Sequence, residues 1–376
     1  MSVVNLPGGR RLTLSASTWA KPAGPPSSRI AYAAAHVVAD PRAENAPGEP
    51  AALDWERTLA FRRHLWSHGL GVAEAMDTAQ RGMGLDYAAT RELIRRSAAE
   101  KGGPIVAGVA TDQLPPGQVT LEQIRAAYTE QLGDVLTAGA APVLMCSRHL
   151  ASAARDADDY LGIYRDLLEK SDKPVVLHWL GTAFDPALEG YWGSSDVDKA
   201  TETVLELINS NPAKVDGIKV SLLDADHEIG LRRRLPAGVR LYTGDDFNYP
   251  QLIRGDEQGY SDALLGIFAA IAPAAGAAFA ALDRGDLDEY DGIFAPTVPL
   301  SRHIFKKPTF WYKTGIVFLA WLTGHQDHFT MVGGLQSGRS VPHFATLIEL
   351  ADAAGLFPDP DLSAHRANRF FEVMAG

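Results

Sequence analysis

The chain has a single cysteine, Cys146, among its 376 residues. One cysteine excludes an intramolecular disulfide and a zinc site built from thiolates, and it suits a protein of the reducing cytoplasm. Cys146 closes the apolar run 143–146, where a small buried side chain is the commoner role of a cysteine. We therefore expect Cys146 to belong to the core rather than to act as a nucleophile.

Positive charge is also scarce, because 35 Lys and Arg stand against 46 Asp and Glu and give a formal net charge of −11. Such a chain repels phosphate backbones and anionic membrane surfaces, and no basic cluster interleaved with aromatics offsets the charge locally. The apolar stretch 315–322 is far shorter than the roughly 20 residues that span a bilayer, and the N-terminus lacks the signal-peptide pattern. We expect a cytoplasmic protein that binds neither nucleic acid nor membranes.

From Ser28 onward, short β-prone runs alternate with longer segments of helical periodicity. This alternation is typical of parallel strands joined by crossover helices. Since no GxGxxG follows the first strand, it favours an α/β protein with a closed (β/α)₈ barrel, a TIM barrel, over an open dinucleotide-binding sheet. The predicted strands are 29–38, 71–76, 104–109, 141–146, 174–177, 217–220, 239–242 and, least distinctly, 259–268.

Helix signals support the same organisation. Asp86 can cap the first turn of a helix, and Thr120 to Gln123 has the spacing of a capping box. We predict an N-terminal extension at 1–27, the barrel at 28–298 and a helical C-terminal extension at 299–376. A short strand at 12–16 is expected to plug the bottom of the barrel, and the C-terminal helices to pack on it and build an oligomer contact.

Lys219 is the residue that stands out chemically. It interrupts the predicted strand 217–222, and the strands of a parallel barrel are buried on both faces. Burial disfavours a charged ammonium, which leaves a fraction of free amine able to attack a carbonyl. The resulting iminium stabilises the carbanion or enamine that forms when a neighbouring carbon–carbon bond breaks. A snorkelling or ion-paired lysine is the structural alternative, and Lys313 is a competing nucleophile.

Five segments, in order, carry a family resemblance: 53–71, 104–109, 216–221, 241–246 and 285–287. Through them the chain from Ser28 to about Tyr290 resembles the dihydrodipicolinate synthase/N-acetylneuraminate lyase family, as a divergent branch of the DUF993 type. The resemblance implies a (β/α)₈ barrel with a C-terminal helical extension, an active site at the C-terminal ends of the strands, and commonly a tetramer. It also implies that Lys219 forms a Schiff base, without a metal or an added cofactor.

Two departures from the family pattern bear on the substrate. Where the family places Thr-Thr-Gly-Glu after its second strand, the stretch 76–82 keeps only Thr78. Asp77 beside it would repel a keto-acid carboxylate unless Arg81 compensates. The family's catalytic tyrosine is absent after the fourth strand, where 147–149 reads Ser-Arg-His.

His149 aligns best with the lost phenol and could shuttle protons near neutral pH. His178 is a second imidazole at the predicted barrel mouth, and hydrogen-bonded structural histidines are the alternative for both. Asp245 could contact substrate hydroxyls, although capping the following loop is its simpler role. The predicted catalytic residues are Lys219 and His149, and the predicted substrate-binding residues are Asp77, Thr78, Arg81, Arg148, His178, Thr243 and Asp245.

These residues together predict a class I aldolase or lyase. Its substrate would be a small polyhydroxylated carbonyl compound, a keto acid or keto-sugar of carbohydrate catabolism. A dehydratase using the same iminium is the nearest alternative, because elimination and retro-aldol cleavage share an enamine. We expect a homo-oligomer, either a dimer or a tetramer.

Two histidine pairs keep a different class of function open. His64 and His68 stand four residues apart on a predicted helix, and His325 and His328 stand three apart, as zinc ligands can. Neither pair has the HExxH pattern, and no cysteines assist them. A metal-dependent barrel and a non-catalytic sugar-binding barrel are the alternatives to a Schiff-base enzyme.

Overall fold

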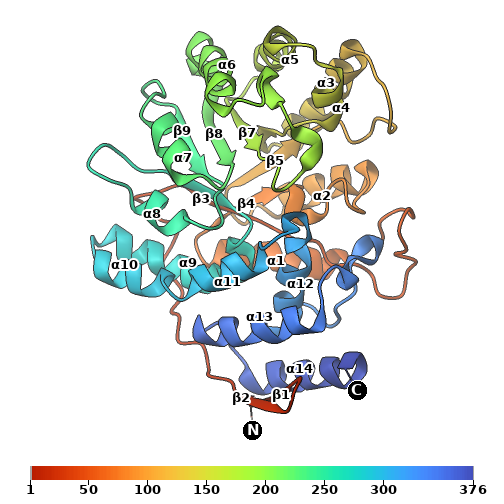
Figure 1. Ribbon diagram of the computed structural model, residues 1–376, viewed down its shortest axis with the longest axis vertical. Helices are drawn as coiled ribbons and strands as arrows, with labels where there is room; N and C mark the ends of the chain where they lie inside the picture. The colour runs from red at the N-terminus through yellow and green to blue at the C-terminus, as the bar shows by residue number, and fades with distance from the viewer. Residues whose placement is uncertain (1, 376) are drawn as a thin grey trace. The chain divides into compact units, whose positions relative to one another are not determined.

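The computed structural model describes residues 2–375, and Figure 1 traces the helices and strands. Eight parallel strands close into a barrel in the order β10-β3-β4-β5-β6-β7-β8-β9, which confirms the predicted fold. Each stretch predicted as a strand overlaps one of these strands, including the least distinct, although β7, β8 and β9 extend beyond the predicted bounds. The barrel strands are β3 (Ala31–Ala34), β4 (Gly71–Glu74), β5 (Ile105–Val109), β6 (Ala141–Leu144), β7 (Val175–Leu180), β8 (Val215–Ser221), β9 (Arg240–Thr243) and β10 (Asp262–Leu265).

Helices separate the strands and continue beyond the last one. The α-helices are α1 (Trp55–Ser67), α2 (Tyr87–Glu100), α3 (Leu121–Thr137), α4 (Arg148–Ala153), α5 (Ala157–Lys170), α6 (Val197–Ser210), α7 (Ala225–Arg232), α8 (Tyr249–Arg254), α9 (Phe268–Asp283), α10 (Leu287–Phe294), α11 (Thr297–Ile304), α12 (Tyr312–Leu322), α13 (Val341–Ala353) and α14 (Pro360–Ala375). Short 3₁₀ helices are η1 (Asp77–Ala79), η2 (Pro186–Leu188), η3 (Tyr191–Gly193), η4 (Pro212–Lys214), η5 (Thr309–Trp311) and η6 (Val332–Ser337).

The predicted helix caps are confirmed. The side chain of Asp86 accepts a hydrogen bond from the backbone N–H of Ala89 at 2.9 Å, which begins α2. At the start of α3, the Thr120 hydroxyl accepts from the N–H of Gln123, and the Gln123 side chain accepts from the N–H of Thr120. Both caps satisfy N–H groups that the first helical turn leaves without a partner.

The described residues form two compact units. The first unit comprises 2–72, 77–85 and 266–375, and the second comprises 73–76 and 86–265. In the first unit, the ring centre of Phe318 in α12 lies 4.3 Å from that of Phe344 in α13 and 5.1 Å from that of Phe370 in α14. The C-terminal helices are therefore held together by aromatic burial. The predicted domain boundaries at 28 and 299 stay predictions.

The N-terminal strand departs from its predicted role. β1 (Val3–Leu6) and β2 (Arg10–Thr13) form an antiparallel hairpin, which lies beside α14 in Figure 1. Asn368 of α14 accepts from the N–H of Asn5 and donates to the carbonyl of Val3. The prediction that this strand plugs the barrel is wrong. A two-stranded hairpin has one apolar face to bury, and α14 covers it.

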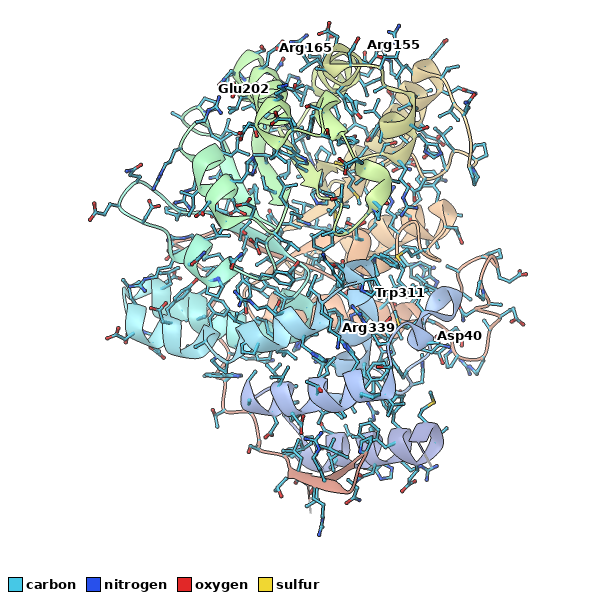
Figure 2. The ribbon with its side chains drawn as sticks, viewed as in Figure 1. Asp40, Arg155, Arg165, Glu202, Trp311 and Arg339 are labelled. Carbon is cyan, nitrogen blue, oxygen red and sulfur yellow. The ribbon has the colours of Figure 1, made fainter. Side chains whose placement is uncertain are left out.

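Charged side chains of the second unit lie mainly on its outer helices. Arg165 of α5 pairs with Glu206 at 2.7 Å, and Arg155 pairs with Asp159 at 3.0 Å, and Figure 2 labels both arginines. Exposed pairs of this kind contribute little to stability. None of the helices in the described part of the chain is both long and apolar enough to cross a membrane.

Candidate active site around Lys219

Lys219 lies on β8, and only 7% of it is exposed. Its backbone is in register with His178 of β7 on one side and with Tyr242 of β9 on the other. Residues paired across neighbouring strands point to the same face of a sheet, and alternate residues of one strand share that face. Lys219 therefore shares its face with His178, Tyr242 and, two residues along β8, Ser221.

His178 is the imidazole nearest to this lysine in the sheet. It is fully buried, and its Nε2 lies 3.4 Å from the hydroxyl oxygen of Ser221. Burial, reinforced by the charge of Lys219, holds the pKa of His178 well below its usual range. The ring is therefore neutral at physiological pH. The half-buried Cys146, just after β6, has its sulfur 3.1 Å from the backbone carbonyl oxygen of His178.

Gly244 leaves the space that the lysine side chain occupies. A Cβ at this position would lie 2.1 Å from the hydroxyl oxygen of Ser221, 2.8 Å from Cε of Lys219 and 2.8 Å from the carbonyl oxygen of Val220. Any larger residue would displace these atoms. The N–H of Gly244 donates to that same carbonyl at 2.7 Å, which holds the backbone close to β8. The glycine of the Thr-Gly-Asp-Asp segment thus fixes where the amine can lie.

The side chains of Thr243 and Asp245 form hydrogen bonds with other groups of the protein. The Thr243 hydroxyl donates to Oε2 of Glu228 at 3.0 Å, and Asp245 accepts from the backbone N–H groups of Phe247 and Asn248 at 2.8 and 3.0 Å. Asp245 is 1% exposed, and it holds the turn that leads into α8. This is the capping role that the sequence left open beside substrate binding.

Glu228 is a buried carboxyl that the sequence did not single out. It lies on α7, accepts from the hydroxyls of Thr243 and Ser261, and is 1% exposed. Burial raises its pKa to about 8, against the opposing effect of these hydroxyl donors. Its position on a helix with a mixed pattern gave no signal, because the hydroxyls that receive it come from β9 and from the residue before β10.

The residues predicted to replace the family tyrosine lie at the start of α4. His149 is half-buried, with Nδ1 3.0 Å from the Thr111 hydroxyl and Nε2 3.2 Å from the carbonyl oxygen of Pro115. Arg148 is exposed and pairs with Asp185 at 2.5 Å. Both ring nitrogens and the guanidinium therefore have local partners, and the catalytic role of His149 stays a prediction.

The predicted residues after β4 belong to the first unit. Asp77 and Thr78 form the start of η1, and Arg81 is buried in the loop that follows. The Thr78 hydroxyl lies 2.8 Å from the phenol oxygen of Tyr312, at the beginning of α12. Sequence reasoning missed Tyr312, since more than 230 positions separate it from Thr78 and no local pattern joins them.

Lys313, the competing lysine, is also buried, with 3% of it exposed. Its ammonium donates to the carbonyl oxygen of Phe310 at 3.2 Å and lies 3.3 Å from the sulfur of Met83. It also lies 4.9 Å from the ring centre of Tyr312. These contacts hold the amine to its own helical turn and to a thioether.

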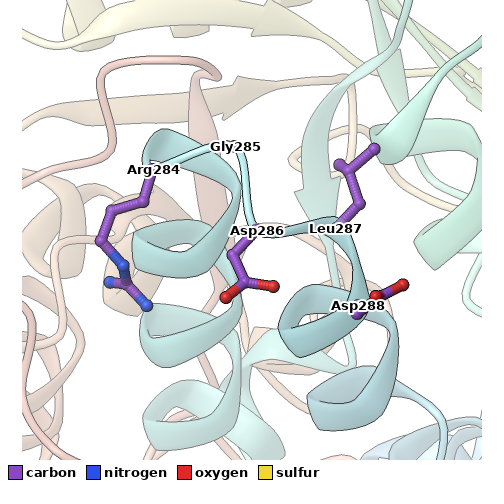
Figure 3. Close-up of a pocket in the computed structure, with 5 residues that line it drawn as sticks. All are labelled: Arg284, Gly285, Asp286, Leu287 and Asp288. Carbon is purple, nitrogen blue, oxygen red and sulfur yellow. The ribbon is translucent and has the colours of Figure 1, made fainter.

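A shallow hollow at the turn between α9 and α10 is open to solvent, and Figure 3 shows the five consecutive residues that line it, 284–288. Asp286 caps α10 by accepting from the N–H of Glu289, and Arg284 pairs with Glu289 at 2.5 Å. This is the helix-to-helix turn predicted at 285–287. Its charged groups serve the turn, so we assign it no chemistry.

Metal ligation was the alternative carried by the two histidine pairs. Within residues 2–375, no three His, Cys, Asp or Glu side chains are placed to hold one metal ion. The structure nevertheless brings His64, His68 and His325 together, while His328 turns its Nδ1 to the N–H of Thr330.

Comparison with known proteins gives a family match and several structural matches. Residues 9–375 match the sequence model of a family described as "Protein of unknown function (DUF993)". No curated protein matches the chain. Among solved structures, a prophage protein of the dihydrodipicolinic acid synthase family from E. coli K12, in complex with pyruvate, is similar with a TM-score of 0.68 and 15% identity. The similarity covers 87% of this chain and 99% of that chain.

Two further structures agree with it. Dihydrodipicolinate synthase from Aquifex aeolicus is similar with a TM-score of 0.66 and 12% identity, over 88% of this chain and 99% of that one. The 4-hydroxy-tetrahydrodipicolinate synthase of Methylacidiphilum fumariolicum SolV gives 0.65 and 14%, over 90% and 99%. At such identities these likenesses show the fold alone, and they confirm the predicted (β/α)₈ barrel.

Proposed function

Because the chain belongs to the DUF993 family, whose name assigns no activity, we propose one from the site itself: an aldolase or lyase that works through a Schiff base on Lys219. The observation that carries this proposal is a buried lysine on a barrel strand, on the same face as a neutral imidazole and a hydroxyl. Burial supplies the low-dielectric surroundings that favour an uncharged, nucleophilic amine.

The reaction begins when the Lys219 amine attacks the carbonyl carbon of the substrate. Loss of water from the carbinolamine gives an iminium, and a base then removes the proton of the hydroxyl two carbons away. The carbon–carbon bond breaks, its electron pair flows into the iminium as an enamine, and an aldehyde leaves. Protonation of the enamine carbon and hydrolysis of the new iminium release the second product and restore the amine.

The proton transfers fall to His178 in this proposal. Its imidazole lies on the same face as the lysine and beside Ser221, and imidazole is the commonest general base and acid in enzymes. Ser221 connects the ring to the strand that carries the lysine. His149, whose two ring nitrogens lie beside Thr111 and Pro115, stays the alternative that the sequence predicts.

We propose the substrate class that the sequence analysis predicts, a polyhydroxylated keto acid or keto-sugar. Asp77 and Arg81 are the charged side chains that follow β4, and they bear on whether a carboxylate is accepted. A homo-oligomer and a cytoplasmic location remain predictions that accompany this proposal.

Borohydride trapping tests the Schiff base directly. The protein is incubated with pyruvate, dihydroxyacetone or fructose, reduced, digested and analysed by mass spectrometry. We expect a reduced adduct on the peptide that contains Lys219 with at least one of these carbonyl compounds. The Lys219→Ala variant should remain unlabelled under the same conditions.

Two results would contradict the proposal. One is the absence of an adduct on Lys219 with all three probes, combined with turnover of any of them that a chelator abolishes. The other is labelling that persists unchanged in Lys219→Ala, since the amine responsible would then lie elsewhere.

A further inference from the structure

A cavity of about 340 Å³ lies entirely within the first unit. Its wall is built from the N-terminal segment 17–21, the end of α1, the start of α9, the end of α12 and the segment 356–358. The volume falls in the range of roughly 300–1,000 Å³ that is usual for small-molecule sites. None of the residues proposed to act with Lys219 lines it.

Three imidazoles gather in this wall. The ring of His64 lies 4.0 Å from that of His325 and 4.8 Å from that of His68, between ring centres. His68 is 5% exposed, and its Nδ1 has no hydrogen-bond partner among the described residues. A buried polar atom left without a partner costs stability, and in native proteins it often marks a place where a ligand or water binds.

The electrostatics of the wall favour one sign of ligand. Lys21 contributes an ammonium, and no Asp or Glu occurs among the described residues that line the cavity. Burial, together with the neighbouring imidazoles and Lys21, holds the pKa of His64 at about 2. An anion would pair with the Lys21 ammonium and accept a hydrogen bond from the N–H of a neutral imidazole. The rest of the wall is apolar and includes Trp19 and Leu319.

We propose that this cavity is a second binding site, which takes a small organic anion: a carboxylate that carries an apolar or aromatic body. The carboxylate accepts hydrogen bonds from the ammonium of Lys21 and from an imidazole N–H, such as that of His68. The apolar body lies against Trp19 and Leu319. Charge-assisted hydrogen bonds of this type are stronger than neutral ones.

A divalent metal ion is the main rival occupant, because imidazole is a common ligand of transition metals. The three rings are not placed to converge on one ion within the described residues. Lys21 would also repel a cation, and the lining offers neither a carboxylate nor a thiolate to balance its charge. These features favour the anion.

Binding is tested with the full chain carrying Lys219→Ala, so that the result does not depend on the Schiff base. The probes are benzoate, the uncharged benzyl alcohol of similar shape, and Ni²⁺, followed by calorimetry and thermal melting. We expect benzoate to bind and, at about a hundredfold excess over its dissociation constant, to raise the melting temperature by about 3 °C. Benzyl alcohol should bind at least about tenfold more weakly.

The pH dependence gives a second readout. The groups that face the bound carboxylate are the imidazoles of His64, His68 and His325 and the ammonium of Lys21. Because an anion favours protonated imidazole, benzoate should bind more tightly at pH 6 than at pH 8, with uptake of protons measured in buffers of different ionisation enthalpy.

Variants locate the site. Lys21 is exposed, so Lys21→Gln should fold normally and lower the affinity for benzoate about tenfold, and His325→Gln should do the same. Lys199→Gln, on the exposed face of α6, is the matched control and should leave the affinity unchanged. Equal binding of benzyl alcohol, an unchanged affinity in Lys21→Gln, or histidine-dependent binding of Ni²⁺ without binding of benzoate would each overturn the proposal.

Discussion

The two units bury ionisable side chains in different ways. In the second unit, Glu228 is buried together with hydroxyl partners from Thr243 and Ser261. In the first unit, the rings of His64 and His325 lie against each other at an angle of 47°, and the buried Nδ1 of His68 has no hydrogen-bond partner within the described residues. A satisfied polar network contributes to a defined geometry, whereas an unsatisfied one reduces stability until something binds to it. Burial alone therefore says little about the function of an ionisable side chain. Its hydrogen-bond partners show whether it stabilises the fold or is left open to a ligand.

The two buried lysines give the sharpest form of this comparison. Lys219→Ala should lower turnover of the best carbonyl substrate by on the order of 10⁴-fold and abolish borohydride labelling, because the nucleophile is lost. Lys313→Met keeps the length of the side chain and should retain labelling, since Lys313 donates to the carbonyl of Phe310 instead. Single-turnover kinetics and mass spectrometry measure both. If Lys313→Met loses the label and Lys219→Ala keeps it, the two lysines exchange roles.

His178 and His149 of the second unit come next in expected effect. His178→Gln should lower kcat by about 10³-fold and remove a limb of its pH profile, because the ring proposed to move protons is lost. His149→Gln is the matched control and should leave that limb in place. The comparison is made from pH profiles of kcat for the two variants. A larger loss in His149→Gln would restore the role that the sequence predicted for it.

The fold was largely predictable because its signals are local. The capping residues Asp86 and Thr120 and the apolar strand 104–109 each act within a few positions of the chain. Order then limits the topology, since alternating strands and helices lead to parallel pairing. The packing of the β1–β2 hairpin on α14 was not predicted, because its partner Asn368 lies at the other end of the sequence. Nothing in a short alternating strand says which helix will cover it.

The site was predictable only in part. Lys219 stands out because a charged residue in a buried strand is rare, and Ser221 follows from it by the two-residue period of a strand. Tyr312 meets Thr78 across 234 positions of the chain. Glu228 meets Thr243 only 15 positions away, but through the packing of α7 on β9, which no local pattern signals. The histidine pairs were visible as spacings, but only the folded chain shows that His325 joins His64 and that His328 does not.

The glycines test how closely the backbone sets the position of the amine. In Gly244→Ala, the new Cβ would meet Cε of Lys219 and the hydroxyl of Ser221, so turnover should fall by on the order of 10²-fold through displacement of the lysine. Stability should fall by about 1–3 kcal/mol because the site is overpacked. Gly230→Ala, on α7 with open space around its Cβ, is the control. It should keep full activity and gain about 0.5–1 kcal/mol from helix propensity. Equal activity in both variants would mean that Gly244 does not constrain the lysine.

The smallest expected effect is on stability as a function of pH, which should change in opposite directions in the two units. The carboxyl of Glu228 has a pKa near 4.5 when exposed and about 8 in the fold, so the folded state holds a proton that the unfolded state has lost. Its contribution to stability is therefore complete below pH 4.5 and is lost as the pH rises through about 8. Glu228→Gln should remove this loss, which gives a melting temperature about 3 °C above the wild type at pH 8.5 and little difference at pH 5.

The imidazoles of the first unit should respond in the opposite direction. Burial lowers the pKa of His68 and of His325 from 6.5 to about 4, so the unfolded state binds protons that the folded state refuses. Their contribution is complete above pH 6.5 and is lost as the pH falls through about 4. Hydrogen exchange, measured segment by segment, should show protection of α1 and α12 falling in acid while that of α7 and β9 falls in base. A loss of protection in both units at the same pH extreme would show that their buried groups do not set the pH dependence, because burial of a carboxyl and burial of an imidazole shift the balance of bound protons in opposite senses.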